Sequence, residues 1–195
     1  MTRHSTRPVV LASESPRRRA LFQAFGIPFR VAVPRVQELH DERLTPAQLV
    51  RHNARLKADA LAGSLADGVV VAADTVVALG ARCFGKPKSA DEARRMLTRL
   101  SGRTHQVYTG VCIIDAQRTR RWVDVISTNV TMRKLSPRDI ARYVARMAHW
   151  DKAGAYAVQD LENLLIDRVD GSLSNVIGLP LHVVERRLRQ CGVLG

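Results

Sequence analysis

Hydrophobic and polar positions alternate along the chain in blocks that predict strands and helices following one another. Short apolar or alternating runs bounded by turn residues are typical of strands that are buried on one or both faces. Two of these runs are joined by the polar turn 116–121, which predicts a hairpin. The predicted strands are 9–12, 29–33, 69–79, 106–115, 122–132 and 164–169.

The predicted helices start at residues that satisfy the free backbone N–H groups of a first turn. A serine or threonine caps most starts, and a proline at the next position is already set to a helical φ. Two of the helices close at a glycine, Gly26 and Gly63. Alternating strands and helices with one long hairpin inside predict an α/β fold with a mixed, largely covered sheet. The helix starts are Ser15-Pro16, Thr45-Pro46, the capping box 89–92, Ser136-Pro137 and Pro180.

Length and composition are those of an ordinary globular protein. The 195 residues suit one domain, or two lobes sharing one core, and 46% of them are hydrophobic. No apolar run approaches the roughly 18 residues that cross a bilayer, and residues 1–8 lack the features of a secretory signal. The three cysteines, Cys83, Cys112 and Cys191, match no disulfide or zinc pattern. We therefore expect a cytoplasmic protein without membrane contact.

The basic charge favours an acidic ligand without naming it. The formal net charge is +13, and most of the basic residues are arginine. Such a charge is typical either of a nucleic-acid-binding surface or of a pocket for a polyanion. Aromatic residues make up only 5% of the chain and form no cluster of the kind that stacks bases. Both interpretations stay open at this point.

Asp74 is the strongest catalytic candidate on chemical grounds. It stands inside the apolar strand 69–79, where a carboxylate loses its hydration. That loss is costly unless the group is paired, hydrogen-bonded or bound to a metal. A core aspartate satisfied by backbone amides is the structural alternative. An ionisable group in such a place is nevertheless a better functional candidate than one on the surface.

A second candidate is the junction 11–18 between the first strand and the first helix. A helix start offers free N–H groups and the positive end of the helix dipole, both suited to phosphate. Ser13 and Ser15 add hydroxyl groups, and Arg17 and Arg18 have the planar donor geometry that binds phosphate bidentately. Because arginines in a first turn oppose the dipole, an anion site is favoured over a capped surface helix.

The segment 80–87 matches P-loop spacing as far as Lys86 and then departs from it. Pro87 stands where serine or threonine would bind magnesium, and no helix follows directly, so a P-loop is excluded. Lys86 is equally compatible with a phosphate contact and with an ordinary hairpin return. His105, in the polar stretch 100–110, is more often a structural residue than a base or ligand.

Six segments, taken in order, resemble the Maf family of nucleotide pyrophosphatases over about residues 8 to 190. The resemblance implies a single Maf-like domain, 1–195, with an elongated Maf/ITPase-like mixed β-sheet flanked by helices and two lobes around a central cleft. It also implies a divalent cation, Mg²⁺ or Mn²⁺, and suggests a homodimer. The segments are LASESPRR (11–18), VAADTVV (71–77), GKP (85–87), RLSGRTHQVYTG (99–110), DKAGAYAVQ (151–159) and GSLSNVIGLPL (171–181).

The resemblance also assigns roles to individual residues. Asp74 matches the proton acceptor of the family and would hold the metal with Glu38. Arg17, Thr75 and Gln159 match positions associated with substrate choice. The pattern Asp-Thr with a later Gln is similar to the dTTP/UTP type, whereas a sister group acting on 7-methyl-GTP shows Asp-Gln and Glu. Other polar cleft positions are matched by Ser13, Arg18, Lys57 and Lys86.

The chain departs from the family pattern at several positions. Gln37 replaces an acidic residue before Glu38, which leaves fewer charges for a metal. Asp160 replaces a glycine beside the base-reading Gln159 and reduces backbone freedom there. Glu162-Asn163 and Leu173 replace further small residues and a tyrosine. These departures bear on substrate preference more than on the type of reaction.

The expected reaction is in-line attack of water on the α-phosphorus of dTTP or UTP, with pyrophosphate leaving. Asp74 and Glu38 would hold the cation, and the arginines and lysines would bind the β- and γ-phosphates. Gln159 offers both a donor and an acceptor to a pyrimidine base. One alternative is a pyrophosphatase for 7-methyl-GTP or another non-standard purine nucleotide. Another is a basic nucleic-acid-binding or cell-division regulatory protein, which leaves the buried Asp74 unexplained.

Overall fold

A computed structural model of the chain describes residues 7–63, 65, 67–146, 152–158 and 165–195. It is built on one seven-stranded mixed sheet in the order β2-β1-β3-β5-β6-β7, with β4 paired to β3. β1 runs parallel to β2 and β3, and the other pairs are antiparallel. The strands are β1 Val9–Ala12, β2 Arg30–Ala32, β3 Val69–Leu79, β4 Arg82–Phe84, β5 Thr104–Asp115, β6 Arg120–Met132 and β7 Ile166–Asp170.

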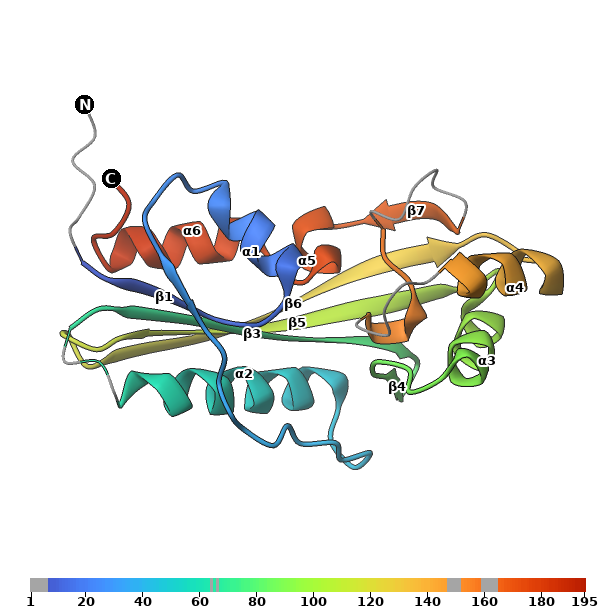
Figure 1. The fold of residues 1–195 in the computed structure, drawn as a ribbon, viewed down its shortest axis with the longest axis horizontal. Helices are drawn as coiled ribbons and strands as arrows, with labels where there is room; N and C mark the ends of the chain where they lie inside the picture. Colours follow the sequence, from blue (N-terminus) through green and yellow to red (C-terminus); the bar gives the residue numbers. More distant parts are fainter. Residues whose placement is uncertain (1–6, 64, 66, 147–151, 159–164) are drawn as a thin grey trace.

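Helices cover both faces of this elongated sheet (Figure 1). α2 lies along one face, while α1, α5 and α6 lie on the other, and α3 and α4 pack at the end far from the termini. None of the helices in the described parts of the chain is long and apolar enough to cross a membrane. The helices are α1 Pro16–Gln23, α2 Pro46–Ala62, α3 Ala90–Leu100, α4 Pro137–Arg146, α5 Leu173–Ile177 and α6 Leu181–Gln190, with a 3₁₀ turn at Ala153–Ala155.

The predicted α/β fold with a mixed sheet flanked by helices is confirmed, with local differences. α5 and the 3₁₀ turn were not predicted, because each is shorter than the runs that hydrophobic periodicity detects. The first helix ends at Gln23, and Gly26 instead takes a φ of +64° in the turn that follows. The division into two lobes stays a prediction.

The predicted capping box at 89–92 is only half formed. The Ser89 hydroxyl accepts a hydrogen bond from the backbone N–H of Glu92 at 3.2 Å, as expected. The Glu92 carboxylate, however, accepts from the backbone N–H of Lys88 at 2.7 Å and not from that of Ser89. A complete capping box forms at the start of α2, between Thr45 and Gln48.

The sheet separates the core into layers, and β3 contributes to both of its faces. Val69 and Val71 pack with α1 and α6, while Val70 and Ala72 pack with α2. The side chains of a strand alternate between faces with a period of two. Asp74 therefore faces α2, and Thr75 faces the layer of α1 and α5.

Gly110 on β5 allows α2 to lie close to the sheet. It is the register partner of Asp74 on β3. A Cβ atom at this position would lie 2.3 Å from the backbone carbonyl oxygen of Val50 on α2. No real side chain fits at that distance, so α2 and β5 are in backbone contact here. The close approach brings the polar side chains of α2 within reach of Asp74.

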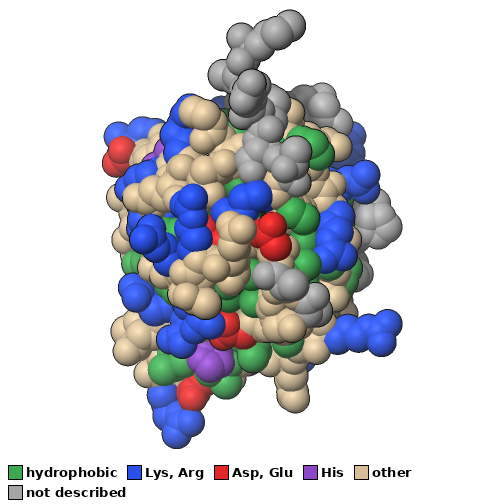
Figure 2. Space-filling model, turned by 90° about the vertical axis from the view of Figure 1, so that its left-hand side faces the viewer, with side chains coloured by type: hydrophobic (Ala, Val, Ile, Leu, Met, Phe, Trp, Pro, Cys, Tyr) green, Lys and Arg blue, Asp and Glu red, His purple; other side chains and the backbone are tan. Residues whose placement is uncertain are grey.

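At one end of the molecule the basic side chains lie among side chains of other kinds (Figure 2). Figure 2 shows one end of the molecule, where lysine and arginine side chains alternate with acidic and apolar ones. Several of the arginines are paired, among them Arg7 with the fully buried Asp115 and Arg187 with Asp124. Part of the positive charge is thus paired with carboxylates within the fold.

His105 is a buried structural residue, as the sequence indicated. Its Nε2 atom lies 2.6 Å from the hydroxyl oxygen of Tyr156, which belongs to the hydrophobic cluster around α3 and α4, and both side chains are buried. Burial lowers the pKa of His105 to about 4, because the charged imidazolium loses its hydration. The contact anchors the segment 152–158 to the sheet.

We expect Gly110→Ala to destabilise the fold by about 1–3 kcal/mol or more, because the added methyl group overlaps the backbone of α2. Urea unfolding measures the loss. The matched control is Gly63→Ala at the end of α2, where a Cβ meets nothing within 4 Å and φ is −65°. That change should leave stability unchanged or raise it by roughly 0.5 kcal/mol. Equal effects of the two substitutions would contradict the close-approach argument.

Acid should destabilise the protein through His105. The unfolded chain takes up a proton near pH 6.5, whereas folded His105 does so only near pH 4. The free energy of unfolding is therefore unaffected by this group above about pH 6.5. It decreases as the pH falls toward 4, by on the order of 3 kcal/mol. The difference between wild-type and His105→Gln unfolding free energies, measured across this range, should change accordingly. His182→Gln, at an exposed position on α6, should run parallel to the wild type.

Candidate active site

The site lies at a break in strand pairing along β3. β1 pairs with β3 up to the register pair Ala12 and Ala72. β4 pairs with β3 from the register pair Phe84 and Val77 onward. Among the described strands, none pairs with residues 73–76 on this side, while β5 pairs along the whole stretch on the other. We call residues 73–76 the β3 gap. Asp74 and Thr75 lie in it, at the carboxyl ends of both β1 and β4.

The segments that follow β1 and β4 meet across the β3 gap. Ser13 and Glu14 come directly after β1, and Lys86 comes after β4. The Lys86 ammonium lies 3.9 Å from the Glu14 carboxylate, and both side chains are exposed. The Ser13 hydroxyl accepts a hydrogen bond from the backbone N–H of Ser15 at 3.2 Å. Two segments that lie far apart in sequence thus border the β3 gap.

Asp74 is paired on the face that α2 covers. Its side chain is nearly inaccessible, with 6% of the residue exposed. Asp74 Oδ1 accepts a hydrogen bond from Lys57 Nζ at 2.7 Å, and Asp74 Oδ2 accepts one from Asn53 Nδ2 at 3.3 Å. Lys57 Nζ also lies 2.9 Å from Glu38 Oε1. The ammonium of Lys57 is therefore shared by both predicted metal-binding carboxylates.

Asn53 fixes the loop that carries Glu38. Its Oδ1 atom accepts from the backbone N–H of Leu39 at 2.8 Å, and its Nδ2 group donates to the Leu39 carbonyl oxygen at 3.1 Å. The irregular segment before α2 is held in this way against the helix. One buried amide thus positions Glu38 and Asp74 relative to one another.

Thr75 and Arg18 meet on the opposite face of β3. Arg18 Nη2 donates to the Thr75 hydroxyl at 2.9 Å, and Arg18 Nε donates to the carbonyl oxygen of Gly178 at 2.8 Å. Burial lowers the pKa of Arg18, and the nearby charges of Asp74 and Glu38 oppose that shift. Arg18 therefore holds Thr75 and the end of α5 together. Its predicted phosphate contact stays a prediction.

A buried chain of hydrogen bonds continues from Thr75 to α5. The Thr75 and Thr109 hydroxyl oxygens lie 2.9 Å apart, and Thr109 donates to the backbone carbonyl of Asn175 at 3.1 Å. The Asn175 amide donates to the Val107 carbonyl and to the Thr128 hydroxyl. Thr109 and Asn175 are fully buried. These bonds fix α5 against β5 and β6 beside the β3 gap.

Most of the predicted site residues come together around the β3 gap. Arg17 lies half-buried beside Arg18, whose pKa its charge lowers further. Gln159, with its neighbour Asp160, lies outside the described residues, as does the pair Glu162-Asn163. The predicted residues placed at the β3 gap are Ser13, Arg18, Glu38, Lys57, Asp74, Thr75 and Lys86.

The carboxylates of Asp74 and Glu38 suit a divalent cation that is also bound by a substrate. Both direct an oxygen to one cationic point, now occupied by the Lys57 ammonium. In the described residues, no group of three or more histidine, cysteine or acidic side chains gathers to hold a metal. Mg²⁺ and Mn²⁺ commonly bind through one or two carboxylates, with phosphate oxygens and water completing the coordination. The pair fits that chemistry.

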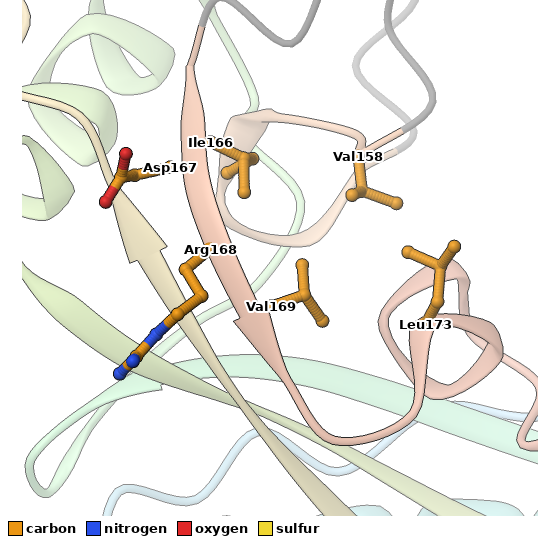
Figure 3. A pocket seen from close by; sticks show the side chains of 6 residues that line it. All are labelled: Val158, Ile166, Asp167, Arg168, Val169 and Leu173. Carbon is orange, nitrogen blue, oxygen red and sulfur yellow. The ribbon is translucent and has the colours of Figure 1, made fainter.

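Two pockets of the structure lie away from Asp74. Figure 3 shows one of about 270 Å³ beside β7 and the start of α5, where Val158, Val169 and Leu173 surround the same space. Leu173 is 52% exposed and stands where the family pattern has a tyrosine. A second pocket, of about 240 Å³, is formed mainly by polar side chains of α2. The site at the β3 gap is identified by its paired charges and not by a cavity.

Sequence reasoning missed Asn53, Thr109 and Asn175. Asn53 precedes Lys57 by four residues on α2, and this spacing places both on the face that carries the buried Ala54 and Val50. Two polar residues on an apolar helix face were a usable signal. Thr109 and Asn175 stand in segments that matched the family, but nothing in the sequence shows that they contact one another.

Comparison with known proteins identifies the family. A family model described as Maf-like protein matches residues 8–191. A protein of Moorella thermoacetica named dTTP/UTP pyrophosphatase is 46% identical over 185 residues, which cover 95% of each chain. A protein of the same name from Desulforamulus reducens is 42% identical over 187 residues, covering 96% of this chain and 98% of the other.

A solved structure shares the fold at low sequence identity. The Staphylococcus aureus Ham1 protein is 16% identical, with a TM-score of 0.55 over 94% of this chain and 98% of the other. This likeness supports the predicted Maf/ITPase-like architecture and nothing further. The family model and the close relatives both span nearly the whole chain, so this protein belongs to the Maf-like protein family.

Proposed function

We propose that this protein is a nucleoside triphosphate pyrophosphatase that hydrolyses dTTP and UTP to the monophosphate and pyrophosphate. The observation that carries the proposal is the buried Asp74 carboxylate, which shares a lysine with Glu38 at the β3 gap. Relatives named dTTP/UTP pyrophosphatase at 46% and 44% identity support this substrate class. The membership of the Maf-like family agrees with the same reaction.

Asp74 is the proton acceptor in this proposal. Water attacks the α-phosphorus in line, the bond between that phosphorus and the bridging oxygen breaks, and the proton of water passes to the carboxylate. Lys57 and Asn53 occupy one position on each carboxylate oxygen, which leaves further lone pairs for water. Their bonds orient the carboxylate before substrate arrives.

Asp74 and Glu38 would hold the divalent cation, Mg²⁺ or Mn²⁺. When bound, such a cation offsets charge on the triphosphate and lowers the pKa of a coordinated water. Lys57 would then contact phosphate oxygens, together with Lys86 and the arginines of α1. Pre-positioned cations of this kind stabilise the charge that develops on the leaving pyrophosphate.

Base recognition belongs to the other face of β3. Thr75 is held there by Arg18 and Thr109, so its hydroxyl has a fixed direction. Gln159, with one donor and one acceptor, would bind the edge of uracil or thymine. Arg17 would contribute to the same choice. By the family resemblance, the pair Asp74-Thr75 and the later Gln159 together separate this assignment from the 7-methyl-GTP type.

Asp74→Asn should lower kcat by on the order of 10²-fold or more, because the amide cannot accept the proton of the attacking water. Pyrophosphate release from dTTP with Mg²⁺ present measures the loss. The control is Asp59→Asn, also on the α2 side, where the carboxylate is half-exposed and pairs with Arg121. Near-normal turnover by Asp74→Asn would refute the catalytic assignment.

The substrate class is tested with a panel of triphosphates. Wild-type protein with Mg²⁺ or Mn²⁺ should release pyrophosphate from dTTP and UTP with a kcat/KM at least about tenfold above those for purine triphosphates. A preference for 7-methyl-GTP would overturn the pyrimidine assignment and keep the reaction. Absence of pyrophosphate release from every triphosphate would overturn the reaction itself.

A further inference from the structure

We propose that Lys57 is an internal cation that competes with the divalent metal for Glu38 and Asp74, so that the metal binds tightly only together with a triphosphate. The inference rests on the proposed function, because it concerns the same carboxylates. It concerns the order and coupling of binding, which the reaction alone does not specify.

The Lys57 ammonium sits at the point on which both carboxylates converge. It lies 2.7 Å from Asp74 Oδ1 and 2.9 Å from Glu38 Oε1. These distances are those of charge-assisted hydrogen bonds. Lys57 and Asp74 are both buried, with 7% and 6% of each residue exposed. A metal ion that binds at this shared point, through Asp74 Oδ1 and Glu38 Oε1, displaces the ammonium.

The charge at this point explains why a metal alone is a weak competitor. The cluster contains two carboxylates and one ammonium, and Asn53 adds only a neutral amide. In the described residues no third carboxylate, histidine or cysteine joins them to hold a metal. A metal that arrives alone would leave the Lys57 ammonium buried beside a second cation. That arrangement is costly in a site with little water.

A triphosphate removes this obstacle. Its oxygens add ligands for the metal and negative charge for the displaced ammonium. Lys57 then exchanges one set of anionic partners for another and does not lose its partners. The affinities of metal and triphosphate are therefore coupled, and the coupling is reciprocal.

The pairing of Lys57 with Glu38 does more than give a buried charge a partner. The Glu38 side chain is 39% exposed and can be hydrated by water, so it does not require a lysine. Its loop is nevertheless fixed to α2 through the two bonds between Asn53 and Leu39. This fixation directs the Glu38 carboxylate to the same point as Asp74. Convergence of two carboxylates is what a divalent cation needs.

The test measures Mn²⁺ binding without nucleotide, from the free Mn²⁺ signal in electron paramagnetic resonance. Lys57→Met and Lys57→Gln remove the charge and should bind Mn²⁺ at least about tenfold more tightly than wild type. Lys57→Arg keeps the charge and should bind as weakly as wild type. Lys88→Met makes the same charge change at an exposed loop position and should also match wild type. Circular dichroism establishes that each variant is folded.

The neutral variants should also gain a larger rise in Tm from Mn²⁺ than wild type does, since tighter binding to the folded state stabilises it more. Glutamine keeps a hydrogen-bond donor, so it provides a second variant if methionine at position 57 does not fold. Equal or weaker Mn²⁺ binding by the folded neutral variants would overturn the proposal. That result would leave pyrophosphate release by wild type untouched. Conversely, absence of hydrolysis would overturn the proposed function but not the competition.

Discussion

The buried charge of Asp74 is the constraint on which the arrangement of this site depends. A carboxylate buried in an otherwise largely apolar strand is stable only beside a positive charge or hydrogen-bond donors. α2 supplies both, through Lys57 and Asn53. It can do so only because Gly110 lets the helix backbone touch β5 at the register of Asp74. The packing of a helix on a sheet thus determines the electrostatics of the site.

β3 carries residues for both the proposed chemistry and the proposed base recognition, because the neighbouring strand β1 ends early. Asp74 and Thr75 point to opposite faces of β3, and a continuous sheet would separate them. β1 stops at Ala12, so the β3 gap leaves both residues next to the segment that leads into α1. From there Arg18 reaches Thr75 on one face, while its pKa still responds to Asp74 and Glu38 on the other. The residues proposed for chemistry and for base recognition thus meet at the end of a short strand.

The sequence predicted the parts of this arrangement that depend on local pattern. The strands, the capped helices and the anomalous position of Asp74 follow from periodicity and residue type. The pairing of Lys57 with Asp74 does not, because it depends on the height of α2 above the sheet and on the register of β3 with β5. Glu38 reaches the same lysine only through a loop fixed by Asn53. Family resemblance named Lys57 and Glu38 as site residues, but it did not show that they contact one another.

Long-range hydrogen bonds were likewise beyond sequence reasoning. Thr109 and Asn175 are 66 positions apart, and each looks like an ordinary polar residue in its own segment. Asn175 also lies in no helix that the sequence pattern predicts, since α5 is too short to be detected. Only the fold shows that they connect Thr75 to α5. The half-formed capping box at Ser89 is the reverse case, where a local pattern was present and Glu92 found another donor.

Stability alone does not account for a polar cluster at this place in the core. Replacing a buried ion pair by apolar side chains of similar volume is often neutral or stabilising, whereas removing one partner is costly. Valine and alanine surround Asp74 along β3, and the buried Ala54 and Ala58 lie near Lys57 on α2, so an apolar cluster would pack readily here. The β3 gap instead contains charged groups and hydrogen-bond donors, which belong to Asp74, Lys57 and Asn53. Such an arrangement favours a functional role for the carboxylate, in agreement with the proposed proton acceptor Asp74.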